Sequence, residues 1–475
     1  MNDSFFFYDL ETSGVNARSA RIMQFAGQRT DMNLNPIGEP ENILIKLSED
    51  VLPEPEAILI TGITPQKTLV EGITEADFYK YFYKEIVQPG TIFAGFNSVR
   101  FDDEFMRFGM FRNFYDPYEW QWKDNSSRWD ILDLVRITRA LRPEGIKWPF
   151  GSDGKASNRL ELLTSLNKLE HTDAHDALSD VRATINVAKL IKEKQPKLFS
   201  YLLSLRTKKS VENFIKQNEM FVYVSGRYDS KYEKLAVVAS VGLNKEGSSA
   251  FVFDLRYDPS LFLNMSPEDL ADALRYKKDS EQSILIPVKQ LQFNKCPAVA
   301  PLGVLNDADQ ERLNIDIKSS KKYLQILRSS NEFYNNLLKA YEILNNDYKQ
   351  TALIANVNNA EAELYDSFIP NEDRSLYNDI HSSNPSEIMR FKDLLKDDRL
   401  KAILPLYKAR NFPKSLSDEE ASGWENYKNS KINQELGPFV QKVSSLQQRE
   451  GLTQNQKYIL EELLLYAQSI APFEV

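Results

Sequence analysis

The first strand that the hydrophobic pattern predicts lies at the N-terminus of the chain. Four consecutive aromatic residues, Phe5 to Tyr8, lead into Asp9, Leu10 and Glu11, and the Ser13-Gly14 pair that follows is typical of a turn. Because successive side chains of a strand point to opposite faces, we expect Asp9 and Glu11 on the same face. Two carboxylates at the edge of a core repel each other, so the pair indicates a bound cation. The alternative is two solvated acids at the end of a strand.

The rest of the first 196 residues alternates short apolar runs with stretches whose apolar residues recur at the spacing of a helix. Strands followed by alternating helices and strands favour one α/β domain, which we expect to end near Gln195-Pro196. The predicted strands after the first are residues 21–30, 42–46 and 92–96, and the predicted helices are residues 53–60, 129–142, 159–166 and 176–194, with a further helix opened by Asp102.

Beyond residue 196 the pattern changes twice. A helical stretch at residues 198–216 precedes four short, β-branched runs separated by Gly, Asn, Ser and Pro residues, which is typical of a small β barrel or sandwich. A strong helix follows at residues 323–344, and from about residue 358 nearly every segment has helical spacing. We therefore expect three domains: an α/β domain at residues 1–196, a β domain with inserted helices at residues 197–350 and an all-α domain at residues 351–475.

Composition narrows the class of protein. Hydrophobic residues make up 42% of the chain and charged residues 27%, which is typical of a globular protein, and no apolar run is long enough for a membrane span. The single cysteine, Cys296, excludes an intramolecular disulfide and a Cys-rich zinc site, and it fits the reducing cytoplasm. A net charge of −9 argues against a protein that coats nucleic acid, although an enzyme needs only a local basic groove.

Two further aspartates and one of the three histidines join the opening pair. Asp102 lies at the junction of a predicted strand and helix, and Asp180 lies on an apolar-faced helix. His175 precedes Asp180 by five residues, about 140° around a helix, so we expect it on the loop before that helix. Each also has a simpler interpretation: Asp102 as a helix N-terminal acid, Asp180 as a solvated residue and His175 as a cap or surface histidine.

Together, these side chains predict metal-dependent chemistry. Asp9, Glu11, Asp102 and Asp180 offer oxygen ligands without thiols, which suits two Mg²⁺ ions, with Mn²⁺ as a possible substitute. Two such ions can stabilise the attacking and leaving oxygens of a phosphoryl displacement. A histidine such as His175 can take the proton of an attacking water near neutral pH. The pattern therefore predicts hydrolysis of phosphodiesters.

Three segments resemble the exonuclease motifs of the DEDD family, in its histidine-bearing branch: Asp9-Leu10-Glu11, Asn97 to Asp102, and His175 to Asp180. The resemblance implies a ribonuclease H-like α/β fold, two divalent metals and 3′→5′ polarity. Longer segments are similar to the bacterial exodeoxyribonuclease I family, which adds an SH3-like β barrel and a helical domain. These segments are residues 99–104, 112–118, 125–130, 141–145, 287–289, 294–297 and 410–413.

This resemblance implies a processive exonuclease that degrades single-stranded DNA to 5′-mononucleotides in DNA repair and recombination, and that acts as a cytoplasmic monomer without membrane association. Members of the family also dock the acidic C-terminal tail of the single-stranded DNA-binding protein, for which Arg142, Tyr201 and Arg328 are the candidates here. Two other functions stay open. One is an RNA-trimming or proofreading member of the wider DEDD family, and the other is a non-catalytic nucleic-acid-binding scaffold.

An enzyme that acts on single strands needs stacking surfaces and local cations along a groove. The resemblance implies substrate contacts at Glu11 and in the segment from residue 100 to 160. Lys289 and Phe293 lie four residues apart on a strand predicted at residues 284–293, and they would extend the groove on one face of the β domain. The alternative is that the aromatic residues are core and the arginines are ion-paired. The contacts expected in the first domain besides Glu11 are Arg107, Tyr118, Trp122, Arg136 and Arg159.

Overall fold

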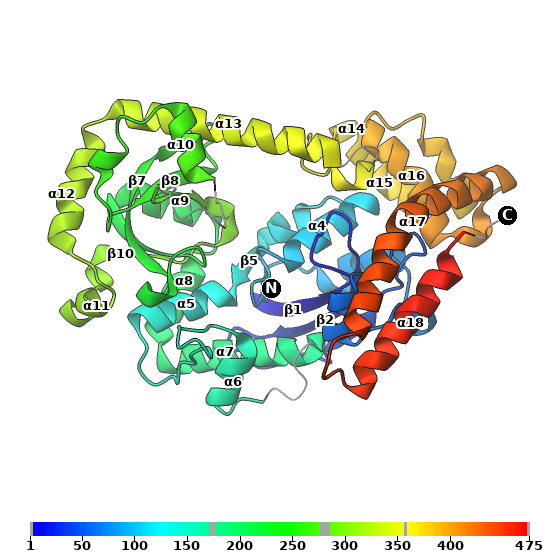
Figure 1. Cartoon of the computed structure of the whole chain (residues 1–475), viewed down its shortest axis with the longest axis horizontal. Helices are drawn as coiled ribbons and strands as arrows, with labels where there is room; N and C mark the ends of the chain where they lie inside the picture. Colours follow the sequence, from blue (N-terminus) through cyan, green and yellow to red (C-terminus); the bar gives the residue numbers. More distant parts are fainter. Residues whose placement is uncertain (1–2, 171–175, 276–285, 356–358, 473–475) are drawn as a thin grey trace.

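The computed structural model describes residues 3–170, 176–275, 286–355 and 359–472, with the side chains of residues 349–355 left out of the description. Its first domain contains a five-stranded sheet in the order β3-β2-β1-β4-β5, in which β1 is antiparallel to β2 and parallel to β4 (Figure 1). β1 is the central strand and lies between β2 on one side and β4 on the other. The strands are β1 (Ser4–Thr12), β2 (Ile22–Thr30), β3 (Glu41–Leu44), β4 (Thr91–Gly95) and β5 (Ser127–Asp130).

Helices cover both faces of this sheet because β1 is apolar on both. Phe5 and Phe7 belong to the core shared with α5 and α7, whereas Phe6 and Tyr8 belong to the core under α3 and α4. Since side chains alternate, Asp9 and Glu11 continue the Phe5–Phe7 face, toward α7. The helices are α1 (Pro55–Thr61), α2 (Pro65–Glu71), α3 (Glu75–Tyr81), α4 (Asp102–Arg112), α5 (Ile131–Leu141), α6 (Leu160–Leu166) and α7 (Ala177–Lys194).

The second domain is built on another five-stranded sheet, in the order β10-β6-β7-β8-β9. The helical stretch predicted at residues 198–216 is two helices, α8 and α9, and α10 is inserted between β8 and β9. The elements are α8 (Pro196–Ser204), α9 (Lys208–Gln217), β6 (Met220–Val224), β7 (Leu235–Leu243), β8 (Ser249–Asp254), α10 (Pro267–Leu274), β9 (Val288–Gln292), β10 (Val299–Pro301), α11 (Asp307–Arg312) and α12 (Ile317–Arg328).

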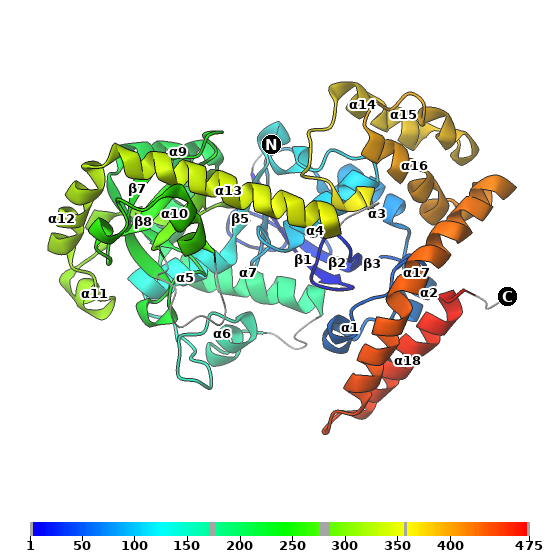
Figure 2. The ribbon, with the colours of Figure 1, turned by 45° about the horizontal axis from the view of Figure 1, so that its top comes forward.

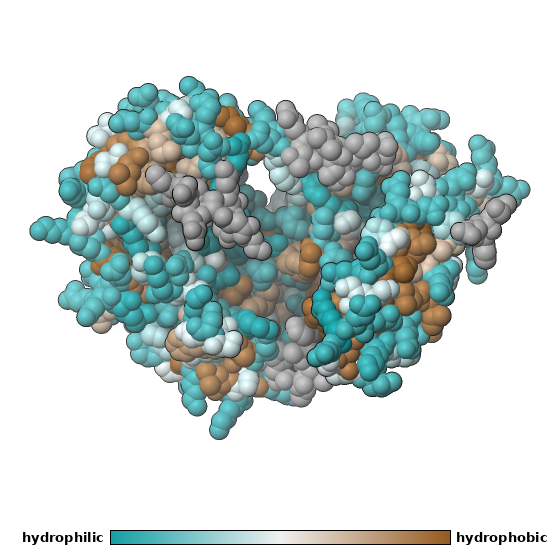
Figure 3. Space-filling view, viewed as in Figure 1, coloured by the Kyte–Doolittle hydropathy of each residue, from teal (hydrophilic) through white to brown (hydrophobic). Residues whose placement is uncertain are grey.

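A single long helix, α13 (Asn331–Ala355), runs from the second domain to the third (Figure 2). The third domain is helical, and its last two helices pack against α1 and α2 of the first domain through an apolar cluster that includes Ile58 and Leu460. The face seen in Figure 3 is hollowed between the second and third domains. The remaining helices are α14 (Asn371–Ser375), α15 (Tyr377–Ser382), α16 (Asp398–Asn411), α17 (Asp418–Gln447) and α18 (Gln454–Ile470).

The predicted succession of an α/β domain, a β domain and a helical domain is confirmed. Three further predicted elements differ from the structure by more than small shifts at their ends. The single helix predicted at residues 323–344 is interrupted at Ser329-Ser330, where α12 ends before α13 begins. Trp129 lies on β5 rather than on a helix, because Asp130 caps α5 by accepting a hydrogen bond from the Leu132 amide. The strand expected to reach Phe293 ends at Gln292, and Phe293 begins a 3-10 turn. In the part of the chain that is described, no helix is long and apolar enough to cross a membrane.

Buried ion pairs join the first domain to the third. Arg410 of α16 makes a two-point contact with Asp50, with Nε–Oδ1 and Nη2–Oδ2 distances of 3.0 and 2.8 Å, and it also pairs with Glu361. Glu361 in turn accepts a hydrogen bond from Arg21 at 2.7 Å. These cations overcome the cost of burial: Arg410 and Lys431 hold the pKa of Asp50 well below its usual value, and Arg410 and Arg21 lower the pKa of Glu361 to about 2.

We expect Arg410→Ala to lower the free energy of unfolding by roughly 3–5 kcal/mol at pH 7, because two buried carboxylates lose a partner. A carboxyl group whose pKa is lowered on folding stabilises the protein above the pKa of the unfolded chain. The difference between wild type and variant should therefore shrink as the pH falls from about 4.5 toward about 2, where Glu361 is protonated in the folded state.

Denaturant titrations at pH 7 and at low pH measure this difference. The matched control is Arg390→Ala, which breaks the exposed Arg390–Glu387 pair and should change stability by less than about 1 kcal/mol. A loss for Arg410→Ala no larger than that of the control, or one that does not vary with pH, contradicts the electrostatic account.

Candidate active site

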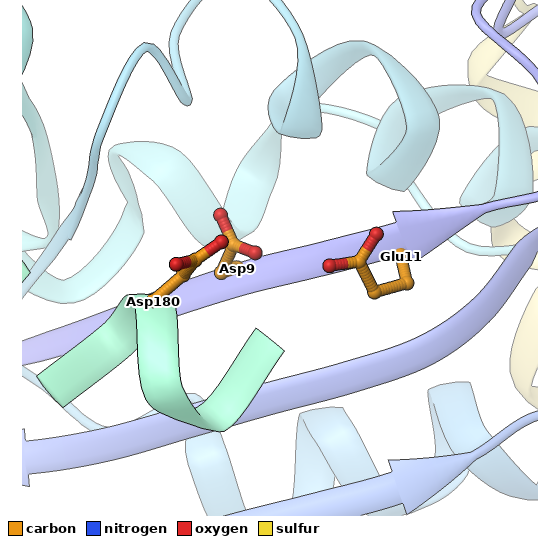
Figure 4. A group of neighbouring side chains, drawn as sticks. All are labelled: Asp9, Glu11 and Asp180. Atoms are coloured by element: carbon orange, nitrogen blue, oxygen red, sulfur yellow. The ribbon is translucent and has the colours of Figure 1, made fainter. Parts of the chain in front are cut away.

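Three carboxylates converge at the end of β1. Oxygen atoms of Asp9, Glu11 and Asp180 all lie within 4.8 Å of one another. Figure 4 shows Asp180, from the first turn of α7, facing the two acids that extend from β1. The convergence follows from the alternation along β1, which turns Asp9 and Glu11 toward the face that α7 covers.

The start of α7 is fixed by contacts with β2. Asp176 caps the helix by accepting a hydrogen bond from the Ser179 amide at 3.1 Å. Gln24, which pairs with Glu11 in the β1–β2 ladder, donates from Nε2 to Asp176 Oδ1 at 3.2 Å and accepts from the Ala177 amide. These bonds set where the first turn of α7 begins, and so they place Asp180 opposite β1.

The fourth predicted carboxylate, Asp102, lies beside the same strand. It is 3% exposed and accepts a hydrogen bond from the Leu10 amide, between Asp9 and Glu11, at 3.1 Å. Its neighbour Asp103 accepts from the Tyr8 hydroxyl and pairs with Arg128 of β5. Asp102 is thus a helix N-terminal acid, as its simpler interpretation expected, but it and Asp103 are both buried and bonded to β1 or β5.

These acids raise one another's pKa values. Burial, followed by the charges of Asp9, Asp180 and Asp176, raises the pKa of Glu11 to about 9. Burial together with Asp102 and Asp180 raises the pKa of Asp9, and burial together with Asp103 raises that of Asp102. A buried carboxyl group with a raised pKa is stable in its ionised form only when a cation lies beside it. A set of ligands made up entirely of carboxylates fits a divalent metal ion. His175, the predicted base, lies outside the described residues.

A cavity of about 1210 Å³ extends between the first and second domains. Three of the expected substrate contacts line it: Arg107, Tyr118 and Trp122. Trp122 is 62% exposed, so much of its ring is accessible to a base. The Tyr118 ring is in contact with a cation, because the Arg107 guanidinium lies over it at 5.5 Å from the ring centre. The basic side chains in the lining are Arg107, Arg128, Arg206, Lys208, Lys209 and Lys295.

A second cavity, of about 440 Å³, shares Glu104, Lys295 and Gln292 with the first. Two more of the expected contacts, Arg136 and Lys289, line it. The two cavities therefore form one path in which five of the residues expected to contact the substrate lie. That path has basic side chains along both parts, which is the local groove that an acidic protein needs to bind a polyanion.

The other three expected contacts are absent from the described lining of this path, and the first of them, Glu11, lies with the carboxylates at the end of β1. Arg159 is exposed, pairs with Glu161 and is absent from the described lining of both cavities. Phe293 is fully buried in the core of the second domain, because the chain turns there instead of continuing β9. The expectation that Lys289 and Phe293 share an open face of one strand was wrong.

Sequence reasoning missed several basic residues of the path. Lys295 follows the turn at Phe293, and its position could not be derived from local spacing. Arg206, Lys208 and Lys209 lie between α8 and the first turn of α9, and their clustering in the sequence was a usable signal of a basic surface.

Three protein-family models match successive parts of the chain: "Exonuclease" at residues 6–188, "Exonuclease I SH3-like domain" at residues 206–343 and "Exonuclease I C-terminal domain" at residues 358–470. The exodeoxyribonuclease I of Haemophilus influenzae is 38% identical over 469 residues, which cover 98% of this chain and 98% of that protein. The predicted domain limits at residues 196 and 350 stay a prediction.

Solved structures of exonuclease I superpose on nearly the whole length of this chain. Escherichia coli exonuclease I in complex with a dA16 oligonucleotide is 35% identical, with a TM-score of 0.91, and covers 99% of this chain and 100% of that one. A structure described as an ExoI/SSB-Ct complex has the same identity of 35%, TM-score of 0.91 and coverage of 99% and 100%.

We expect Mg²⁺ or Mn²⁺ to raise the melting temperature of the wild type by a few degrees, since an ion that binds only the folded state stabilises it by about 2.7 kcal/mol at a hundred times its Kd. A carboxyl group whose pKa is raised on folding costs stability above the pKa of the unfolded chain. Asp180→Asn should therefore be at least as stable as wild type without metal, and it should lose most of the metal-dependent rise.

Thermal unfolding with and without metal, at pH 6 and pH 9, measures these effects. Because protons on Glu11 and Asp9 must leave before a cation binds, the rise in the wild type should be larger at pH 9. Asp393→Asn, at an exposed turn of the third domain, is the control and should keep the full rise. An undiminished rise in Asp180→Asn contradicts the assigned metal site.

Proposed function

This chain belongs to the exodeoxyribonuclease I family, and on that premise we propose that Asp9, Glu11, Asp102 and Asp180 form the centre with which it hydrolyses DNA. The chain is an exonuclease of single-stranded DNA. The observation that carries the proposed centre is the convergence of Asp9, Glu11 and Asp180 within 4.8 Å, with Asp102 bonded to the strand between the first two.

The donor set supports Mg²⁺ as the metal, in two ions, with Mn²⁺ as a substitute. Bound there, such ions would supply Lewis-acid stabilisation of the charge on the reacting phosphate and would make the attacking water more acidic. The protein's own part is to hold the carboxylates in place: β1 presents Asp9 and Glu11 from a rigid, doubly packed strand, and the Leu10 amide orients Asp102. We retain His175 as the group that takes the proton of the attacking water.

We further propose that the strand enters through the basic path and meets this centre at its 3′ end, so that 5′-mononucleotides are released. The exposed ring of Trp122 and the half-buried ring of Tyr118 provide stacking surfaces, and Arg107, Arg136 and Lys289 provide cations for the phosphates. The complex of Escherichia coli exonuclease I with a dA16 oligonucleotide supports the binding of a single DNA strand. The same path, with accessory domains on its sides, suits processive digestion.

The C-terminal tail of the single-stranded DNA-binding protein is the proposed partner, as the ExoI/SSB-Ct complex supports. Arg142, at the end of α5, and Arg328, at the end of α12, are the cations for its acidic groups. The half-buried Tyr201 of α8 is the third member of the proposed patch, and its hydroxyl lacks a hydrogen-bond partner among the described residues. We place the reaction in the cytoplasm, in keeping with a single buried free thiol, Cys296.

The main test uses 5′-labelled single-stranded DNA and RNA of one sequence with Mg²⁺. We expect a ladder of DNA products that shortens from the 3′ end, and Asp180→Asn should slow it by at least about a thousandfold, which corresponds to about 4 kcal/mol of transition-state stabilisation. Asp393→Asn should retain wild-type rates. Full activity in Asp180→Asn argues against the assigned centre, and preference for RNA indicates an RNA-trimming enzyme.

The stacking role of Trp122 has its own test. Because stacking on an aromatic side chain contributes about 1–3 kcal/mol per base, Trp122→Ala should raise KM for single-stranded DNA by about 5- to 150-fold, with little change in kcat. Tyr458→Ala removes a ring of α18 that is 54% exposed and far from the path in the sequence, and it serves as the control. Steady-state kinetics that show an unchanged KM for Trp122→Ala disprove the role.

A further inference from the structure

One carboxylate lies in the middle of the basic path. Glu104, on the first turn of α4, lines both cavities at the place where they meet. Among the described residues, the first cavity is lined by six basic side chains and two acidic ones, Asp3 and Glu104, and in the second cavity Glu104 is the single acid against five basic side chains. A negative charge at this point opposes the binding of a polyanion, so its presence needs an explanation.

Glu104 is bonded to side chains from all three parts of the molecule. Its Oε1 accepts hydrogen bonds from Arg107 Nη1 at 2.8 Å and from Lys295 Nζ at 2.9 Å, and its Oε2 accepts one from the Tyr365 hydroxyl. Arg107 belongs to α4, Lys295 to the turn before β10 and Tyr365 to the segment that enters the helical domain. The side chains of Glu104 and Lys295 each keep 23% of their surface exposed, whereas that of Arg107 keeps 5%, so a phosphate in the path reaches Lys295 first and Arg107 only once the carboxylate has moved aside.

We propose that, when no DNA is bound, the Glu104 carboxylate occupies the position on Arg107 and Lys295 that a phosphate of the DNA strand takes. Each phosphate that arrives displaces the carboxylate from these two cations. This inference rests on the proposed function, in which the strand lies along the two cavities. A carboxylate and a phosphodiester both accept charge-assisted hydrogen bonds from Arg and Lys, so one anion can replace the other without leaving a buried cation unpaired. The exchange is close to balanced, and Glu104 therefore limits how tightly the strand is held at this point.

Such a limit has a use in an exonuclease that advances along its substrate. The strand must move by one nucleotide after each hydrolysis, and every phosphate contact must break and re-form. A carboxylate that returns to Arg107 and Lys295 when a phosphate leaves compensates the two cations during that step. Without Glu104 the two cations would keep neutral acceptors, Gln121 Oε1 for Arg107 and the Val99 carbonyl for Lys295, and they would hold the phosphate more strongly.

The alternative is that Glu104 only joins the three domains. The two accounts predict opposite signs for the same substitution. If Glu104 is a structural connection, Glu104→Gln loosens the path and single-stranded DNA binds more weakly. If Glu104 competes with phosphate, the variant binds the strand more tightly.

The experiment measures binding of 5′-fluorescein-labelled oligothymidylate by fluorescence anisotropy in EDTA, where no hydrolysis occurs, over a series of salt concentrations. For Glu104→Gln we expect a Kd three- to tenfold lower at low salt, and a salt dependence steeper by about 0.7 in log–log slope for each phosphate contact strengthened. With Mg²⁺ restored, the steady-state kcat should fall although KM is lower.

Two comparisons isolate the site. Glu119→Gln removes the same unit of charge from an exposed pair with Lys123 outside the described lining of the cavities, and it should change Kd less than twofold. Adding Lys295→Gln to Glu104→Gln should remove most of the gain, because Lys295 is one of the two cations released. An unchanged or higher Kd for Glu104→Gln, or an equal gain in Glu119→Gln, overturns the proposal.

A third variant, Lys295→Gln, leaves Glu104 in place. It therefore tests the proposal even if proteins with a substituted Glu104 do not fold. Because Lys295 is compensated by Glu104, Lys295→Gln alone should weaken binding less than Lys209→Gln, which changes another lysine of the same cavity. The opposite order overturns the proposal. Failure of the proposed function would give a different result from failure of the Glu104 proposal. If the proposed function is wrong, wild type does not bind the oligonucleotide, or Trp122→Ala binds it as tightly as wild type.

Discussion

Repulsion among carboxylates at the end of one buried strand is the constraint on which the rest of this structure depends. Asp9, Glu11, Asp102 and Asp180 are held together although burial and mutual charge raise the pKa values of the first three. Only a rigid surrounding can hold ionisable groups in that arrangement. The aromatic residues on both faces of β1 and the capped start of α7 provide it.

The third domain contributes to the same rigidity. Ser13 follows Glu11 and Thr12 at the end of β1 and forms two hydrogen bonds with Arg21. The Ser13 amide donates to the Arg21 carbonyl, and the Arg21 amide donates to Ser13 Oγ, each at 2.8 Å. Arg21 then pairs with Glu361, and Glu361 with Arg410 of α16. A continuous series of buried polar contacts thus connects the strand that bears Glu11 to the helical domain.

The sequence was sufficient where local periodicity determines the result. Alternation along β1 predicted that Asp9 and Glu11 share a face, and the spacing of apolar residues predicted the helix that carries Asp180. Positions that depend on how the chain turns in space were less accessible. Phe293 continues an apolar strand pattern, yet the backbone turns at that residue and buries its ring. Lys295 lies in a segment that resembles the family, but no local spacing predicted its bond to Glu104 on a distant helix.

The long helix α13 has a consequence for how the domains can vary. It has 25 residues, so it acts as a strut of about 37 Å between the second and third domains. In a flexible linker an added residue is absorbed by rearrangement, but in a helix it rotates everything beyond it by about 100° and shifts it by about 1.5 Å. The length and register of α13 therefore set the direction in which the chain leaves the second domain.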